Sequence, residues 1–193
     1  MNKKRLIFLG PPGAGKGTQA KILADYLAVP HISTGEILRK AKQEGTPVGI
    51  KAKAYMDRGD LVPDSVLQEL VQERLQQDDA KTQGWILDGF PRTLPQAEFL
   101  GKLLPEINQA CDLIINLTVA DEILVGRLAK RAAVEGRSDD TEDVIRNRLV
   151  VYQQETAPLI DFYQQHSVTV DGDRSLEIIT TELKNITKKG IDD

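Results

Sequence analysis

Short apolar runs alternate with longer segments of helical period along most of the chain. The apolar runs are rich in Ile, Leu and Val and lie at Arg5–Gly10, Pro30–Ser33, Gly84–Gly89, Cys111–Val119 and His166–Asp171. Between them, the periodicity predicts helices over Lys16–Leu27, Asp64–Gln77, Leu94–Leu104, Asp121–Ala133 and Thr141–Gln165. This alternation is typical of βαβ units, so it predicts an α/β fold in which helices cover both faces of a parallel sheet. Ligands of such sheets bind outside the carboxyl ends of the strands.

Two segments depart from this core pattern. Thr34–Val62 favours helix but is interrupted by glycines at positions 35, 45, 49 and 59. Lys130–Asp140 is short and polar and has arginines on both sides. We expect both segments to be lobes over the edge of the sheet, and the polar tail Lys188–Asp193 to fray.

The composition excludes several classes of protein. With 40% apolar and 28% charged residues, the 193-residue chain has the balance of a folded globular domain. Its formal net charge of −4 argues against a general nucleic-acid binder, and no apolar run approaches the roughly 20 residues of a membrane span. Leu6–Leu9 is shorter than the core of a signal peptide, so we expect a cytoplasmic protein. The single cysteine, Cys111, cannot form an internal disulfide or a four-cysteine zinc site.

A glycine-rich loop joins the first predicted strand to the first predicted helix. Its glycines and lysine, Gly10…Gly15-Lys16, have the spacing of a P-loop in the required strand–loop–helix context. Such glycines let successive N–H groups turn toward phosphate oxygens, the helix N-terminus adds partial positive charge, and the lysine reaches the β and γ phosphates. Gly17 stands where most such loops have Ser or Thr, and Thr18 follows it.

The sequence contains no convincing general base, but it contains several arginines near the predicted strand ends. His31 and His166 lie at predicted strand starts, where we expect surface or satisfied core residues. Arginines lie in or beside the predicted strand-end loops and lobes at positions 39, 92, 127, 131, 137 and 148. Arginine forks match phosphate oxygens, and a phosphate acceptor is already anionic at pH 7, so it needs no base. The pattern favours transfer between two phosphates.

Four motifs, in this order, resemble those of adenylate kinase over nearly the whole chain. They are Gly10–Thr18, Ile32–Arg39, Asp88–Thr93 and Gly136–Asp140. The resemblance implies a P-loop NTPase-type parallel sheet flanked by helices, with a helical AMP-binding lobe and a short lid. It divides a single domain, 1–193, into a core (1–32, 63–129 and 141–193), an AMP-binding lobe (33–62) and a lid (130–140). It implies reversible phosphoryl transfer between ATP and AMP to give two ADP, which balances the adenine nucleotides.

The resemblance also implies roles for particular residues. The ATP site would comprise Gly13, Ala14, Gly15, Lys16, Gly17, Thr18, Arg127, Arg131 and Arg174. The AMP site would comprise Thr34, Arg39, Asp60, Leu61, Val62, Gly89, Phe90, Pro91, Arg92, Gln96, Arg137 and Arg148. The catalytic set would be Lys16, Asp88, Arg92, Arg131, Arg137 and Arg148, with Asp88 in a water-mediated contact to the magnesium of ATP.

Two departures from the family pattern concern metal and charge. The lid is short and lacks the cysteines that bind zinc in long-lid relatives, so we expect Mg²⁺ with ATP and no structural zinc. Asp60 stands where relatives often have lysine, which changes little if its contact is through the backbone. We expect a monomer whose partners are ATP, AMP and ADP, with no nucleic acid and no membrane.

Two alternatives stay open at this point. A UMP/CMP kinase shares the fold, the phosphate loop and often the short lid; Thr34, whose hydroxyl can bond the adenine edge, and Gln96 favour AMP. A P-loop switch that acts by binding is the other alternative. Gly17 in the hydroxyl position and the lack of a guanine-reading Asn-Lys-x-Asp motif argue against it, since the Asn near a strand end, Asn116, is followed by Leu117.

Overall fold

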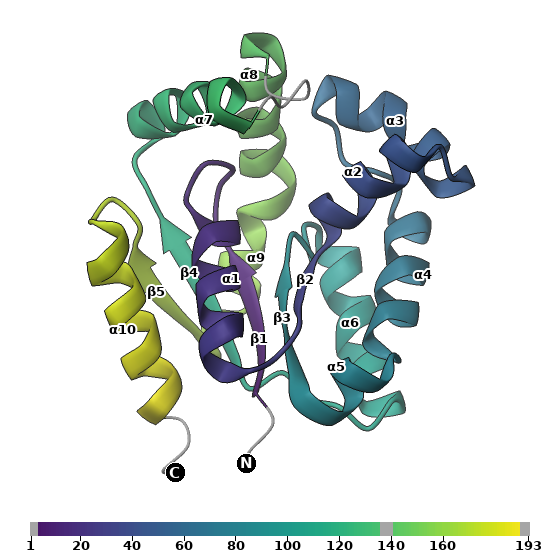
Figure 1. The fold of residues 1–193 in the computed structure, drawn as a ribbon, viewed down its shortest axis with the longest axis vertical. Coiled ribbons are helices and arrows are strands. Elements are labelled where there is room, and N and C mark those ends of the chain that lie inside the picture. Colours follow the sequence, from purple (N-terminus) through teal and green to yellow (C-terminus); the bar gives the residue numbers. More distant parts are fainter. Residues whose placement is uncertain (1–3, 136–140, 190–193) are drawn as a thin grey trace.

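A parallel sheet of five strands forms the centre of the molecule, in the order β2-β3-β1-β4-β5 (Figure 1). The computed structural model describes residues 4–135 and 141–189. The strands are β1 (Lys4–Leu9), β2 (His31–Ser33), β3 (Gly84–Asp88), β4 (Leu113–Thr118) and β5 (Ser167–Asp171). In the centre of the sheet, Leu6 of β1 is in register with Ile86 of β3 and Leu113 of β4. The predicted α/β class and parallel sheet are confirmed.

The helices cover both faces of the sheet, as Figure 1 shows. Successive strand residues point to opposite faces, so Leu6 and Phe8 pack with α1 (Lys16–Leu27) and α10 (Leu176–Lys189). Ile7 and Leu9 pack in the other core cluster, with residues of α4 (Asp64–Leu75), α5 (Asp78–Gln83), α6 (Leu94–Glu106) and α9 (Pro158–Phe162). Both faces of β1 are therefore buried, which explains its continuous apolar run.

Above the carboxyl ends of the strands lie α2 (Thr34–Glu44) and α3 (Pro47–Arg58) on one side and α7 (Asp121–Glu135) and α8 (Glu142–Val151) on the other (Figure 1). The side chain of Ser33 caps the start of α2 by accepting a hydrogen bond from Glu36 N, and the side chain of Thr46 caps the start of α3 by accepting one from Gly49 N. A Cβ on Gly49 would lie 2.1 Å from the carbonyl oxygen of Ala41, so only glycine allows α2 and α3 to pack this closely.

The helix expected over Thr141–Gln165 is not continuous. After α8 the chain makes a π-helical turn, η1 (Tyr152–Thr156), and α9 then ends at Phe162. The extra residue in a π turn rotates the side chains that follow it, and such turns occur often at functional sites. Helix α10 was not predicted from the sequence, and it extends to Lys189, into the tail that we expected to fray. None of the helices in the described ranges is long and apolar enough to cross a membrane.

Replacing Gly84 with alanine is expected to lower the melting temperature without changing the chemistry of the cleft. Gly84 has φ +103° at the start of β3, and a Cβ there would lie 2.2 Å from the carbonyl oxygen of Lys4. A backbone with φ +103° and ψ −163° is essentially restricted to glycine and costs another residue ~1–3 kcal/mol. The clash adds to this cost, so we expect a drop of at least about 4 °C by calorimetry. Gly101→Ala is the matched control: no atom lies within 4 Å of its Cβ, and alanine is the better residue inside a helix. Equal melting temperatures for the two variants would contradict the strain argument.

Candidate active site

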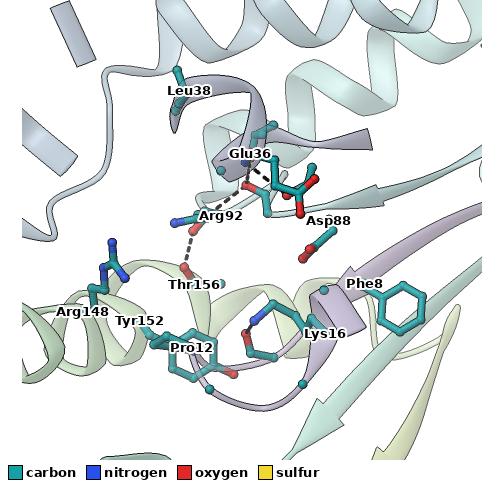
Figure 2. Close-up of a pocket in the computed structure, with 18 of the residues that line it drawn as sticks. Phe8, Pro12, Lys16, Glu36, Leu38, Asp88, Arg92, Arg148, Tyr152 and Thr156 are labelled. Carbon is teal, nitrogen blue, oxygen red and sulfur yellow. Dashed lines mark hydrogen bonds between the residues drawn. The ribbon is translucent and has the colours of Figure 1, made fainter. Parts of the chain in front are cut away.

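A cleft of about 720 Å³ opens at the carboxyl ends of β1, β2 and β3, between the α2–α3 pair and the α7–α8 pair. Its lining includes the loop after β1, Ser33 at the end of β2, Thr34 at the start of α2, and the segment Asp88–Gly89 at the end of β3. A volume of this size is typical of small-ligand sites, and the carboxyl edge of a parallel sheet is where such sites form. Figure 2 shows Lys16 and Asp88 close together in this cleft, with Arg92, Arg148 and Tyr152 across from them.

The loop after β1 has the geometry of an anion cradle. Gly10, Gly13 and Gly15 have φ values of +133°, +87° and +91°, which turn the peptide groups in ways that other residues rarely adopt. A Cβ on Gly10 would lie 2.3 Å from the carbonyl oxygen of Leu117, so β1 and β4 leave room only for glycine. Helix α1 begins at Lys16 without a side-chain cap, so its first N–H groups are available to bind an anion.

Lys16 folds back over this loop. Its Nζ donates to the carbonyl oxygens of Gly10, at 2.7 Å, and Pro11, at 2.8 Å. Burial lowers the pKa of Lys16 to about 8; the carboxylate of Asp88 acts in the opposite direction, and the charges of Arg92 and Arg131 lower the pKa further. The ammonium group therefore lies in a place where an arriving anion would stabilise its charge.

Asp88 lies below the loop at the end of β3. Burial alone would raise the pKa of its carboxyl group, but the pKa is lowered because the neighbouring His31, Lys16 and Arg92 favour the carboxylate. The distance from His31 Nε2 to Asp88 Oδ2 is 3.6 Å, which is longer than a hydrogen bond. His31 is thus neither a surface residue nor a satisfied core residue as expected, because its buried Nε2 has no hydrogen-bond partner among the described residues.

Basic side chains outnumber acidic ones in the cleft, although the whole chain is acidic. Glu36, Asp60 and Asp88 are the acidic residues of the lining. The basic ones come from α1, α2, α7, α8 and the loop after β3: Lys16, Lys21, Arg39, Arg92, Arg127, Lys130, Arg131 and Arg148. The local excess of positive charge favours a polyanionic ligand.

The loop after β3 is fixed by several hydrogen bonds around Arg92. Thr34 Oγ1 and Arg92 Nε donate to the carbonyl oxygen of Gly89, at 2.8 and 2.9 Å. The amide group of Gln96 accepts from Arg92 N at 2.7 Å and donates to Asp64 at 2.6 Å. Thr156, on the π turn, donates to the carbonyl oxygen of Arg92 at 2.8 Å (Figure 2). Arg92 is therefore held through its backbone on both sides and through its side chain.

A second set of contacts joins α3 to α8. The carboxylate of Asp60 accepts hydrogen bonds from Arg58 Nε at 2.7 Å and from Asn147 Nδ2 at 2.8 Å. The bond from Arg58 lowers the pKa of Asp60 most, and the bond from Asn147 lowers it further. Asn147 Nδ2 also donates to the carbonyl oxygen of Arg58. The carboxylate of Asp60 is thus engaged by Arg58 and Asn147, which fits a backbone contact at this position.

The structure gathers most of the predicted site residues in this one cleft. Gly13, Gly15, Gly17, Thr18, Thr34, Leu61, Val62, Gly89 and Pro91 line it together with the charged residues named above. Among the described residues, four predicted ones do not line it: Ala14, Phe90, Gln96 and Arg174. Phe90 and Gln96 are fully buried behind the loop, and Arg174 lines a separate hollow on α10. Arg137 lies outside the described residues, as does the rest of the predicted lid from 136 to 140, whereas 130–135 form the end of α7.

Several contributors to the site were missed from the sequence. Tyr152 and Thr156 lie at the cleft because of the π turn, which the helical period did not reveal. His31 could have been identified from its place on the strand whose carboxyl end enters the cleft. In the described ranges, no group of three or more His, Cys, Asp or Glu residues could hold a metal ion.

A glycine loop before a helix, a lysine folded over it and basic residues on the opposite wall define a P-loop phosphotransferase. The family model for adenylate kinase matches residues 8–168. The chain is 59% identical over 182 residues to adenylate kinase 1 of Nostoc sp., covering 93% of this chain and 96% of the relative. It is 55% identical over 184 residues to the adenylate kinase of Cyanothece sp., covering 94% of each chain, and 53% identical over 186 residues to that of Leptospira biflexa, covering 95% of this chain and 100% of the relative. The chain belongs to the adenylate kinase family, and it is therefore a nucleoside monophosphate kinase.

Proposed function

We propose that this protein transfers the γ-phosphoryl group of ATP reversibly to AMP, giving two molecules of ADP. The observation that carries the proposal is the single cleft in which a phosphate loop faces Arg39, Arg92 and Arg148 from the other wall. One wall is suited to a triphosphate and the other to a second phosphate, so two anionic nucleotides can meet between them.

The donor nucleotide would bind with its phosphates on residues 13–18. The N–H groups at the start of α1 would bind the β-phosphate, and Lys16 would leave the carbonyl oxygens of Gly10 and Pro11 to follow the γ-phosphoryl group. Arg131 of α7 would neutralise charge on the transferred group, and Arg127 would lie at the base. Arg137 belongs to the proposed AMP site and to the catalytic set by the family resemblance alone.

The acceptor would bind between α2–α3 and the loop after β3. Arg39, Arg92 and Arg148 would hold the AMP phosphate, which needs no general base because its second pKa is near 6. The segment 60–62, Thr34 and the loop 89–92 would form the base pocket. Gln96 would contribute through Arg92, or would have to exchange its bond to Asp64 for one to adenine.

Asp88 is suited to the magnesium that ATP brings with it. Its carboxyl group is held ionised, and its Oδ2 lies 3.5 Å from the place where a Cβ of Gly17 would be. This puts an anionic oxygen beside the first turn of α1, where the hydroxyl of other P-loops is missing. Asp88 would hold the ion through water, and the ion would supply charge neutralisation on the phosphates.

We also propose that residues 33–62 and 130–140 close over the bound nucleotides. Transfer to AMP competes with hydrolysis, so water must be excluded while the phosphoryl group moves. An analogue that joins two adenosines through five phosphates should bind far more tightly than either nucleotide, because it fills both sites with one association. Small-angle scattering should show a smaller radius of gyration on its addition; an unchanged radius would contradict closure.

Above pH 8, the protein is expected to take up a proton when it binds ATP. The pKa of Lys16 is about 8 in the unliganded protein, and the triphosphate should raise it. Below pH 8 Lys16 already carries its proton, whereas above pH 8 binding must supply one, so the affinity for ATP should fall as the pH rises. Calorimetry at pH 8.5 in two buffers of different ionisation enthalpy measures the uptake, and Lys16→Met should abolish the difference. The same uptake in that variant would assign the proton to another group.

A coupled assay with ATP, Mg²⁺ and a panel of AMP, UMP, CMP and GMP tests the function. We expect AMP to exceed the others in kcat/KM by at least about tenfold, since an unpaired hydrogen-bonding group in a base pocket discriminates this strongly. Faster turnover of UMP or CMP would reassign the acceptor to a pyrimidine nucleotide. Tight nucleotide retention without turnover would favour a switch instead. The cytoplasmic location and the monomeric state stay predictions, to be checked by fractionation and light scattering.

A further inference from the structure

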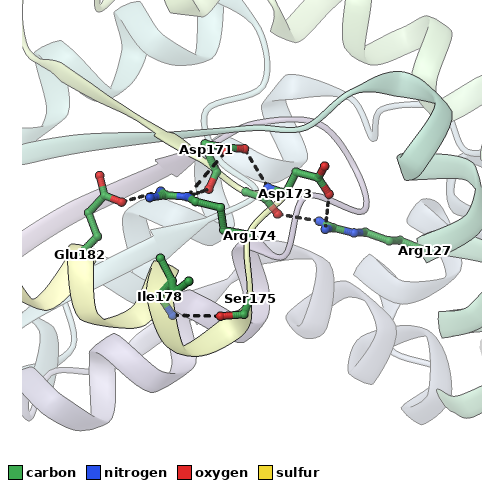
Figure 3. A network of polar contacts seen from close by, with 8 residues as sticks. Arg127, Asp171, Asp173, Arg174, Ser175, Ile178 and Glu182 are labelled. Carbon is green, nitrogen blue, oxygen red and sulfur yellow. Dashed lines mark hydrogen bonds and ion pairs between the residues drawn. The ribbon is translucent and has the colours of Figure 1, made fainter.

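Arg127 is held by two acceptors in the loop after β5. Its Nη1 donates to the carbonyl oxygen of Gly172 at 2.8 Å, and its Nη2 donates to Asp173 Oδ1 at 3.1 Å (Figure 3). Arg127 is on α7 and also lines the cleft. The side chain thus joins the helix that carries Arg131 to the loop at the edge of the sheet.

The loop that supplies these acceptors is itself fixed. Gly172 N donates to the carbonyl oxygen of Thr118 at 2.8 Å, and Asp173 N donates to Asp171 Oδ1 at 2.9 Å. A Cβ on Gly172 would lie 3.1 Å from the carbonyl oxygen of Ala14, so this loop lies directly against the phosphate loop. On its far side Arg174 forms an ion pair with Glu182 of α10 (Figure 3).

The way in which Arg127 is held decides what it can bind. Every donor of a guanidinium group lies in its plane. When both terminal nitrogens bond Gly172 and Asp173, that edge is occupied, and the flat faces remain for contact with a π system. A guanidinium group without these partners, beside a triphosphate, would instead turn its donors to the phosphate oxygens.

We propose that Asp173 is a positioning residue for the donor nucleotide: it holds Arg127 so that the guanidinium face receives the base of the nucleotide whose phosphates lie on the phosphate loop. The inference rests on the proposed function, because it assumes a nucleotide bound at that loop. Asp173 carries negative charge beside a polyanion site, so its direct effect on the phosphates is repulsive and its benefit comes only through Arg127.

The effect of Asp173 on affinity should differ between two ligands, ATP and a triphosphate without a nucleoside. Inorganic tripolyphosphate has the phosphates of ATP without a base. In Asp173→Ala, the dissociation constant of ATP should rise by about fivefold, the size of one lost cation–π stack. The dissociation constant of tripolyphosphate should stay the same or fall, because a repulsive charge has gone and Arg127 is free to turn to the phosphates.

Titration calorimetry of the full chain with both ligands measures the ratio of the two constants. Glu177→Gln is the control, because it removes one charge from the exposed start of α10, in the neighbouring hollow, without touching Arg127. It should leave the dissociation constants of ATP and tripolyphosphate within about twofold of the wild-type values. Asp173→Glu should restore part of the ratio. In an Arg127→Ala background, Asp173→Ala should change the ratio no further, since the two residues act as one unit.

Three results would overturn the proposal. Equal weakening of ATP and tripolyphosphate would show a loss of structure, unchanged constants would show that Asp173 does not act on the site, and tighter ATP binding would show that Asp173 competes with the base for Arg127. Failure of the proposed function is a separate result: a wild-type protein that binds ATP but transfers nothing to AMP leaves the binding comparison intact. A wild type that does not bind ATP overturns both.

Discussion

Lys16→Met is expected to lower kcat by at least about 10²–10³, the cost of removing one preorganised donor at a site of charge development. The ammonium group is held over the loop by Gly10 and Pro11, and burial lowers its pKa to about 8. An arriving triphosphate would stabilise this charge, so the ammonium group would exchange the two carbonyl oxygens for phosphate oxygens. It gains most when the γ-phosphoryl group carries charge between the two nucleotides.

The fold of this variant should survive. Methionine keeps the length and the apolar stem of lysine, and it removes an ammonium group that burial disfavours. The check is stopped-flow measurement of single turnovers together with a melting curve. Lys184→Met on α10, where the lysine stacks on Tyr26 at 4.8 Å, is the control for loss of a positive charge, and its kcat should be unchanged. Near-normal turnover of Lys16→Met would mean that the phosphate loop is not at the chemistry.

The core of the fold could be predicted because its signals are local. Helix α1 has the bounds that the periodicity predicted, since its start is set by the glycine loop and its buried residues repeat once per turn. The strands were found within a residue or two at each end. Helix α10 was missed although Ile179, Leu183 and Ile186 have helical spacing, because the polar residues around them obscured that apolar face.

Many of the residues that line the candidate site could be predicted from the sequence, but their contacts could not. The motifs placed Lys16, Asp88 and Arg92 near one another because parallel strands bring their carboxyl ends to one edge. Some hydrogen bonds that fix residues of the site come from positions far along the chain. Thr156 donates to Arg92, and Asn147 donates to Asp60. The first depends on a π turn, and the second on the packing of α3 against α8, so neither has a local signal in the sequence.

Asp88→Asn is expected to lower kcat by about 10²–10³ at a saturating concentration of Mg²⁺ and to weaken the dependence of the rate on Mg²⁺. Asparagine has nearly the shape of aspartate but lacks the anionic oxygen that lies beside the first turn of α1. The measurement is a titration of Mg²⁺ at constant ATP. Asp112→Asn is a suitable control, because that carboxylate accepts from Arg5 N at 2.7 Å near the opposite end of the sheet, and its Mg²⁺ dependence should match that of the wild type.

A second readout separates the charge of Asp88 from any role in folding. The carboxylate of Asp88 raises the pKa of Lys16, against the larger effect of burial. Without that carboxylate, the pKa of Lys16 should fall below about 8, so the uptake of a proton on ATP binding should begin at a lower pH in Asp88→Asn than in the wild type. A variant that binds ATP with the wild-type pH profile would show that Asp88 does not act on Lys16. An uptake that begins at a higher pH would contradict the claim that the carboxylate of Asp88 raises the pKa of Lys16.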